Sequence, residues 1–247
     1  MALALPRAIE TFVRAFAYTR SFTHPCHVHR VGRLWVMRDA PRKRPADCRR
    51  EEWVACGVPP AEVDATARKE SRGHFCISAI LVTDQPDAPV RDAYKSLGYR
   101  LGTTESFMIH GLGRIPKVPE PFPVQRVRSQ DLADRLAVAA RYRQAMPEHL
   151  KPDSPLRQYA ALDSEIPVGW ARSITVGDAT WVSNVYVIPK YRRRGIARAI
   201  LAKMLRDDRA HGATQSVLLA SHTGALLYTA VGYEPIGLLL LFTPSRR

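Results

Sequence analysis

Hydrophobic and polar residues in the second half of the chain follow two different periods. From residue 124 to residue 247 they predict a strand, a helix, three strands, a helix, a strand, a helix and a last strand. Two of the three consecutive strands form a hairpin that turns at Gly177-Asp178. The helix over 196–210 has one apolar face and ends near Gly212. That face comprises Ile196, Ile200, Leu201, Met204 and Leu205. This order of elements predicts an α/β domain with a mixed sheet.

Prolines separate this half from the first half of the chain. Four of them fall within residues 116–123, and such a segment forms neither a helix nor a central strand. It is typical of a stiff, extended linker. We therefore expect two domains, over residues 1–115 and 124–247, joined by this linker.

The composition is typical of a globular protein in water, with 46% hydrophobic and 24% charged residues. No apolar run approaches the roughly 18 residues that a membrane-spanning helix needs. The start of the chain has arginines on an amphipathic pattern. Glu10 and the lack of a small-residue cleavage site favour an ordinary first helix over a transit peptide. We expect a cytoplasmic protein with no membrane partner.

The net charge of +14 raises the question of nucleic-acid binding. The charge is spread over both halves, and no basic block is interleaved with aromatic residues in the way that tracks a single strand. The sequence therefore does not favour a nucleic-acid partner. Local arginines would serve a polyanionic small cofactor equally well.

Cysteine and histidine residues gather in the first third of the chain. No two cysteines form a C-x-x-C pair, and in a cytosolic protein such cysteines are reduced. The segment "THPCHVHR" brings together His24, Cys26, His27 and His29, of which His27 and His29 could share one strand face. Because no second ligand cluster has the spacing of a zinc site, we expect a polar loop there and no metal.

The segment "VYVIPKYRRRGIARAILAKML", over 185–205, combines the features of a phosphate-binding loop. A helix begins at Ile196, and the first N–H groups of a helix lack partners inside it and carry partial positive charge. Gly195 leaves room for a ligand to reach the backbone. The preceding arginines, Arg192–Arg194, can bind phosphate in bidentate fashion. The patterns of nucleoside-triphosphate and dinucleotide loops are absent from the sequence.

Two motifs in this half resemble the GNAT superfamily of N-acetyltransferases. The hexapeptide "RRRGIA", over 192–197, resembles the family's acetyl-CoA pyrophosphate loop, Q/R-x-x-G-x-G/A. Further on, "SHTGALLYTAVGYE" is similar to the family motif N-x-x-A-x-x-L-Y-x-x-x-G-F/Y. The resemblance implies a mixed-sheet GNAT-like fold with acetyl-CoA as co-substrate. It assigns to cofactor binding the residues Val185, Tyr186, Val187, Arg192, Arg193, Arg194, Gly195, Ile196, Ala197, Arg198, Ser221 and Tyr228.

The resemblance also implies roles in catalysis. It gives Tyr228 the role of the acid that protonates the departing thiolate, and it gives the backbone of 185–187 the role of pairing with pantetheine. Two departures from the family pattern weaken the pantetheine side of the site. Ser221 stands where the family has asparagine, and Gly224 stands where it has alanine.

No general base stands out in the sequence. The strand "TWVSNVYV" has no carboxylate where many family members carry a catalytic glutamate. The candidates left open are Asp163, Glu165 and Glu234, or a chain of water molecules.

The first half carries a weaker likeness to the same family. Its "AYKSLGY", with Tyr94, Gly98 and Tyr99, resembles the second motif, "LLYTAVGY". No R-x-x-G-x-G/A loop precedes it. We therefore expect a degenerate GNAT-like domain over 1–115 and an acetyl-CoA-binding GNAT domain over 124–247. An unrelated domain of helices and sheet is the alternative for the first half.

The resemblance implies direct transfer of an acetyl group from acetyl-CoA to a primary amine. The acceptor is a small molecule or peptide that the sequence does not identify. The candidates for its binding are the segment around 142–160 and the first domain. A non-catalytic acyl-CoA-binding sensor or scaffold is the alternative, because the strand carboxylate is missing. A nucleic-acid binder that uses the overall charge is the third hypothesis.

Overall fold

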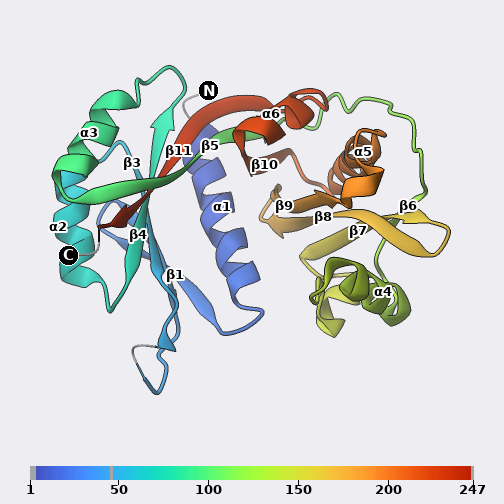
Figure 1. Cartoon of the computed structure of the whole chain (residues 1–247), viewed down its shortest axis with the longest axis horizontal. Coiled ribbons are helices and arrows are strands. Elements are labelled where there is room, and N and C mark those ends of the chain that lie inside the picture. Colours follow the sequence, from blue (N-terminus) through green and yellow to red (C-terminus); the bar gives the residue numbers. More distant parts are fainter. Residues whose placement is uncertain (1–3, 45–46, 246–247) are drawn as a thin grey trace. The chain divides into compact units, whose positions relative to one another are not determined.

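The computed structural model describes residues 4–44 and 47–245, and these form two compact units (Figure 1). Within the described ranges, unit 1 comprises residues up to Met108, residues 219–222 and residues from Pro235 onward. Unit 2 comprises residues 109–218 and 223–234.

Helices and strands alternate along the described chain. The helices are α1 (Ala4–Arg20), α2 (Pro60–Glu70), α3 (Ala88–Ser96), α4 (Gln130–Ala140), α5 (Ile196–Ala210) and α6 (His222–Thr229), with short 3-10 helices η2 (Pro147–Leu150) and η3 (Pro189–Tyr191). The strands are β1 (Cys26–Val31), β2 (Leu34–Asp39), β3 (Glu51–Cys56), β4 (Phe75–Val82), β5 (Tyr99–His110), β6 (Val124–Arg126), β7 (Leu156–Asp163), β8 (Ile166–Val176), β9 (Ala179–Val187), β10 (Gln215–Ala220) and β11 (Glu234–Pro244).

Unit 1 is built on strands in the order β1-β2-β3-β4-β11-β5. The pairs β1/β2 and β2/β3 are antiparallel, and β3/β4 is parallel. Helices α2 and α3 cover one face of β3 and β4, and α1 lies on the other (Figure 1). The α2 and α3 side buries a cluster around Trp53, Ile77 and Tyr94. Because helices cover both faces, β4 is apolar along nearly its whole length.

The last strand of the chain belongs to unit 1 from Pro235 onward. Gly237–Phe242 pair in antiparallel fashion with Ile77–Val82 of β4. The ring of Phe242 is buried in the core of unit 1 and stacks on Tyr94 with 4.3 Å between ring centroids. The end of the chain thus completes the sheet that its beginning forms.

The bounds of the two units therefore differ from the predicted division at the proline-rich segment. Residues 116–123 form neither a helix nor a strand, and they lie within unit 2. The units do not follow the predicted bounds 1–115 and 124–247, because β11 contributes to the core of unit 1.

Unit 2 contains strands in the order β10-β9-β8-β7-β6. Pairs from β6 to β9 are antiparallel, and β9/β10 is parallel. Helices α4 and α5 cover opposite faces of this sheet (Figure 1). Leu132 and Leu136 of α4 pack in one core cluster with Trp170 of β8. The apolar face predicted for α5 is buried, and α5 has the predicted bounds.

The two parts of the chain repeat one topology. Three antiparallel strands are followed by a helix, a parallel strand, a second helix and a long strand. The first copy runs from β1 to β5 and the second from β7 to β11. This repeat is what a tandem arrangement of related domains requires.

Two predictions about local structure are wrong. The apolar spacing over residues 131–146 predicts a single helix, but the helix ends at Ala140, because Arg141 takes the left-handed conformation with φ of 63°. His27 and His29, predicted in a polar loop, lie in β1, which pairs with β2 along its length. Among the described residues, no group of three or more His, Cys, Asp or Glu side chains could hold a metal ion.

The stacking of Phe242 on Tyr94 predicts that β11 stabilises unit 1. Phe242→Ala should lower the free energy of unfolding by about 3–5 kcal/mol, the usual cost of removing a buried phenyl ring. Urea unfolding followed by circular dichroism measures this. Leu226→Ala, at a side chain that is 79% exposed, is the control and should change stability little. Equal effects of the two substitutions would contradict the role assigned to β11.

Candidate active site

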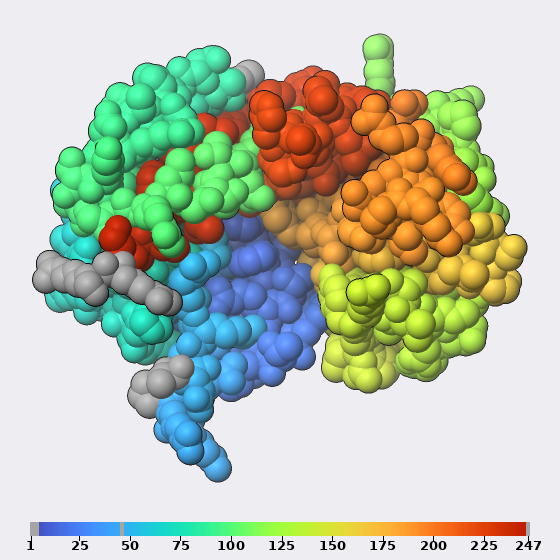
Figure 2. Space-filling model, in the orientation of Figure 1, coloured from blue at the N-terminus to red at the C-terminus, as the bar shows by residue number. Residues whose placement is uncertain are grey.

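The loop between β9 and α5 leads into a helix without a side-chain cap. Gly195 precedes the helix in the left-handed conformation, with φ of 81°, and no described side chain hydrogen-bonds to the first turn. The N–H of Ala199 donates to the carbonyl of Gly195, which leaves the N–H groups of 196–198 directed out of the helix start. A Cβ on Gly195 would meet no protein atom within 4 Å. Figure 2 shows α5, in orange, at the surface, so an anion can reach these groups.

The three arginines of the loop have different surroundings. The Arg192 Nε donates to the carbonyl of Val187 at 3.0 Å, and its guanidinium lies 5.6 Å from the ring centre of Tyr186. Arg193 and Arg194 are exposed. Arg192 is therefore tied to the end of β9, whereas the other two arginines extend positive charge around the loop.

Strand β9 pairs with β10 over only a short stretch. Ala179–Trp181 are in register with Gln215–Val217, and no further pair joins the two strands within the described residues. Along its other edge, β9 pairs with β8 as far as Val187. The residues of β9 after Trp181 thus have a hydrogen-bonding edge that β10 does not use. The predicted pantetheine-binding backbone, over 185–187, lies on this edge.

A β-bulge at Asn184 separates this edge from the paired part of β9. Trp170 of β8 pairs with Tyr186, whereas Arg172 pairs with Ser183, so two residues of β9 oppose one of β8. Asn184 itself has φ of 55°, a conformation that asparagine tolerates better than most residues. Such a bulge bends its strand and re-aims the following side chains. The sequence offered one signal for it, an asparagine within a strand of β-branched and aromatic residues.

Gly169 sets how closely the start of α5 approaches the sheet. A Cβ on this β8 residue would lie 3.0 Å from Cγ2 of Ile196 and 3.1 Å from the carbonyl oxygen of Tyr186. Ile196 is the first residue of α5 and is buried. The absence of a side chain at Gly169 therefore lets the first turn of α5 lie against the end of β9.

The other end of α5 is fixed by the buried carboxylate of Asp208. It accepts hydrogen bonds from Arg157 Nη2 at 2.7 Å, from Ser173 Oγ at 2.8 Å and from Thr180 Oγ1 at 2.9 Å. These three residues come from β7, β8 and β9. One acidic side chain thus joins α5 to three strands.

Tyr228 lies on α6 and is half-buried. Its ring centre is 5.9 Å from that of Tyr233, in an edge-to-face arrangement. The hydroxyl of Tyr233 shares a 2.7 Å hydrogen bond with Ser216 of β10, which places Tyr228 beside the strand that diverges from β9. Ser221 is exposed and belongs to the 219–222 segment of unit 1. Its assignment to cofactor binding stays a prediction.

The strand, loop and helix that carry this geometry match a known domain. Residues 155–235 match the family model of the acetyltransferase (GNAT) domain. This stretch includes the diverging strands, the whole arginine loop and Tyr228. The second half of the chain contains a GNAT domain.

Solved structures have the same fold at low sequence identity. A GCN5-related N-acetyltransferase from Kribbella flavida superposes with a TM-score of 0.63 at 18% identity, over 97% of this chain and 96% of its own. One from Sphaerobacter thermophilus gives 0.55 at 16%, over 87% and 78% of the two chains. A tandem GNAT protein from the clavulanic acid biosynthesis pathway gives 0.55 at 15%, over 87% and 81%. No curated protein matches the chain. The predicted GNAT-like mixed-sheet fold is confirmed.

A GNAT domain is an acyltransferase domain, which agrees with the predicted class of enzyme. Within the described ranges, no helix is both long enough and apolar enough to cross a membrane.

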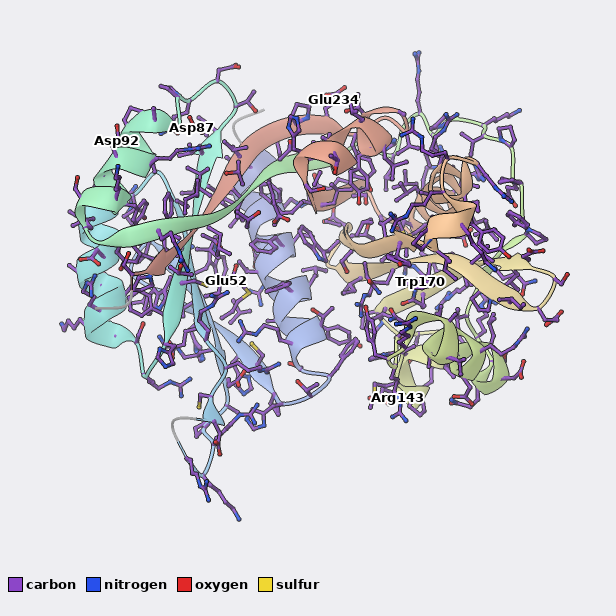
Figure 3. All side chains as sticks on the ribbon, in the orientation of Figure 1. Glu52, Asp87, Asp92, Arg143, Trp170 and Glu234 are labelled. Carbon is purple, nitrogen blue, oxygen red and sulfur yellow. The ribbon has the colours of Figure 1, made fainter. Side chains whose placement is uncertain are left out.

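The acidic residues considered as general bases have other partners or are exposed. Tyr191 donates its hydroxyl to Asp163 at 2.8 Å, which raises the pKa of the tyrosine. Glu165 forms an ion pair with Arg135. Glu234 is exposed and lies close to α6 (Figure 3). Strand β9 itself contains no carboxylate. The geometry does not identify any of these three acidic residues as the general base.

Unit 1 lacks the features that shape the loop of the GNAT domain. All six residues of β3, Glu51–Cys56, pair with Phe75–Ile80 of β4, so these two parallel strands do not diverge. Pro59 and Pro60 stand at the start of α2 and have no N–H to offer an anion. Glu62 places a negative charge in the first turn of α2. The helix dipole favours a negative charge at this position, so the Glu62 carboxylate takes the place of a bound anion and repels it.

A polar network beside the bulge was missed by sequence reasoning. The hydroxyl of Tyr142 donates to Asn184 Oδ1 at 3.2 Å, and Asn184 Nδ2 donates to Gln144 Oε1. Trp170 stacks on Tyr186 with 4.8 Å between ring centroids. Only the general location of this network, around 142–160, was expected, because its partners are distant in sequence.

Proposed function

We propose that the GNAT domain transfers the acetyl group of acetyl-CoA directly to a primary amine of a small-molecule or peptide acceptor. The observation that carries the proposal is that an open strand edge and an open helix start follow one another along the chain. The edge of β9 that β10 does not use leads directly into a helix start whose N–H groups are open to an anion. A long ligand with a pyrophosphate and an amide-containing arm matches both features. Its pyrophosphate would bind the N–H groups of the helix start, and its amide groups would pair with the edge of β9.

The residues present fit acetyl-CoA. The N–H groups of 196–198 and the exposed Arg193 and Arg194 would hold the pyrophosphate, with open space over Gly195 for its approach. The backbone of 185–187 would pair with the amide groups of pantetheine. When bound, acetyl-CoA supplies an acetyl group activated as a thioester.

The chain's own groups would orient the reactants and move one proton. Backbone N–H groups at the open edge of β9 are held in place by pairing with β8. They can stabilise negative charge that develops on a carbonyl oxygen beside them. The hydroxyl of Tyr228 would protonate the leaving thiolate. Holding an amine next to the thioester adds the effect of proximity.

A non-catalytic acyl-CoA-binding role is the second candidate, because β9 has no carboxylate and the nearby acids have other partners. Release of thiol from acetyl-CoA in the presence of a panel of primary amines separates the two. Amine-dependent release supports the transferase. Binding of acetyl-CoA without amine-dependent release supports the sensor or scaffold.

We also propose that the first repeat is a degenerate GNAT-like domain with no acetyl-CoA site. The support is the complete pairing of β3 with β4 and the two prolines at the start of α2.

Gly195→Glu should weaken the binding of acetyl-CoA by roughly tenfold or more, a loss of about 1.4 kcal/mol. The substitution places a carboxylate where the phosphate oxygens lie, so like charges repel. Isothermal titration calorimetry measures the effect.

Gly212→Glu is the matched control for this variant. Gly212 lies at the other end of α5 with φ of 87° and, like Gly195, has no protein atom near a built Cβ. Both substitutions therefore strain the backbone to a similar extent and add the same charge. Equal affinities of the two variants for acetyl-CoA would refute the assignment of the loop.

Tyr228→Phe should lower kcat by on the order of 10²–10⁴-fold, the usual contribution of a general acid. The ring that packs against Tyr233 is retained, so stability and acetyl-CoA affinity should change little. The loss should appear in kcat, because the proton moves only in the transition state. Steady-state kinetics with any amine that is turned over measures it. An unchanged kcat would leave Tyr228 with a packing role alone.

A further inference from the structure

The face of the unit 2 sheet that α4 covers carries a group of hydrogen-bond donors. We call Gln144, Trp170, Arg172 and Asn184 the α4-side cluster. The direction of these side chains follows from the strand register. Ser173 bonds to Asp208 on the α5 side, so its neighbour Arg172 points to the α4 side. Trp170 packs in the same core cluster as α4, and Figure 3 shows it on β8.

Two members of the cluster have buried N–H groups with no acceptor among the described residues. Gln144 is 1% exposed, and its Oε1 accepts from Asn184, but its Nε2 has no partner. Trp170 is 3% exposed, and its Nε1 also has no partner. A buried donor that is left unsatisfied costs about 1–3 kcal/mol, so such groups are rare in proteins. Both groups are donors, so each can bind an acceptor atom that a ligand or a water molecule supplies.

The charge at the cluster is positive. Arg172 is half-buried, and burial lowers the pKa of its guanidinium. Burial lowers the pKa of His149 in η2; the negative charge of Glu148 raises this pKa, and the positive charge of Arg172 lowers it. A ligand group with oxygen acceptors and a negative charge complements two N–H donors and a guanidinium. A carboxylate has this chemistry.

The cluster lies close to the place where acetyl transfer is proposed to occur. Asn184 directly precedes the backbone of 185–187, and Trp170 stacks on Tyr186. Strand residues advance by about 3.3 Å each, so a group bound at the cluster lies within a few bonds of a thioester at 185–187.

We infer that the acceptor carries a carboxylate close to the amine that is acetylated, as an amino acid does, and that Gln144, Trp170 and Arg172 bind this carboxylate. The inference rests on the proposed function, because the amine has to reach acetyl-CoA. It adds the chemical class of the acceptor.

The test compares acceptors that differ only in the carboxylate. The matched sets are phenylalanine, phenylalaninamide and phenethylamine, and lysine and 1,5-diaminopentane. Hydrogen bonds to charged groups contribute about 1.5–3 kcal/mol, so kcat/KM should be roughly 10–100-fold higher for the carboxylate-bearing member of at least one set. No preference for the carboxylate in any set that is turned over overturns the inference.

Variants assign the preference to the cluster. Trp170→Phe keeps the aromatic ring over Tyr186 and removes the N–H, Gln144→Leu removes the amide, and Arg172→Met removes the charge. Each should reduce the ratio of kcat/KM between the carboxylate-bearing acceptor and its decarboxylated partner. A loss of stability alone would lower both values and leave this ratio unchanged. Trp35→Phe in unit 1 is the control and should keep the ratio. A ratio that survives all three cluster substitutions overturns the inference.

One further measurement separates failure of this inference from failure of the proposed function. Phenylalanine and lysine are titrated by calorimetry into the protein saturated with CoA. Binding that the cluster variants weaken supports the inference even where turnover is slow. Absence of binding, with CoA bound normally, overturns the inference and leaves the proposed function in place. Absence of CoA binding itself refutes the proposed function.

Discussion

The carboxylate of Asp208 is buried and is held by a guanidinium and two hydroxyl groups from three different strands. Removing one partner of such a buried ion pair typically costs about 3–5 kcal/mol, because the remaining charge is left without compensation. Helix α5 therefore cannot slide along the sheet without breaking all of these bonds. With one end fixed at Asp208 and the other seated on Gly169, the helix start is held against the end of β9. The proposed pyrophosphate site depends on this position.

The same topology in unit 1 shows what the site requires beyond the fold. Strands β3 and β4 pair over the whole of β3, and Pro60 removes one N–H donor from the first turn of α2. In unit 2, pairing between β9 and β10 stops at Trp181, and the bulge at Asn184 follows. The unpaired edge of a parallel strand and a helix start without proline thus occur together in unit 2, and both are missing from unit 1. An open strand edge and an open helix start would serve one extended ligand, as proposed for acetyl-CoA.

Features that depend on neighbouring residues in the chain could be predicted from the sequence. The bounds of α5 and the hairpin at Gly177-Asp178 both arise from local periodicity and turn chemistry. Features that depend on the pairing of distant strands could not be predicted from the sequence. The apolar run of β11 suits any buried strand, and its place beside β4 follows from contacts with residues far away in the sequence. The bulge at Asn184 and the bond from Arg192 to Val187 likewise require knowledge of the register between β8 and β9.

One repeat of this chain is proposed to bind acetyl-CoA, and the other repeat is proposed to lack this site. The most direct test is the stoichiometry of acetyl-CoA bound to the full-length protein, measured by isothermal titration calorimetry and by native mass spectrometry. We expect one molecule of acetyl-CoA to bind per chain. Two molecules per chain would contradict the asymmetry between the repeats, and none would contradict the site at the start of α5.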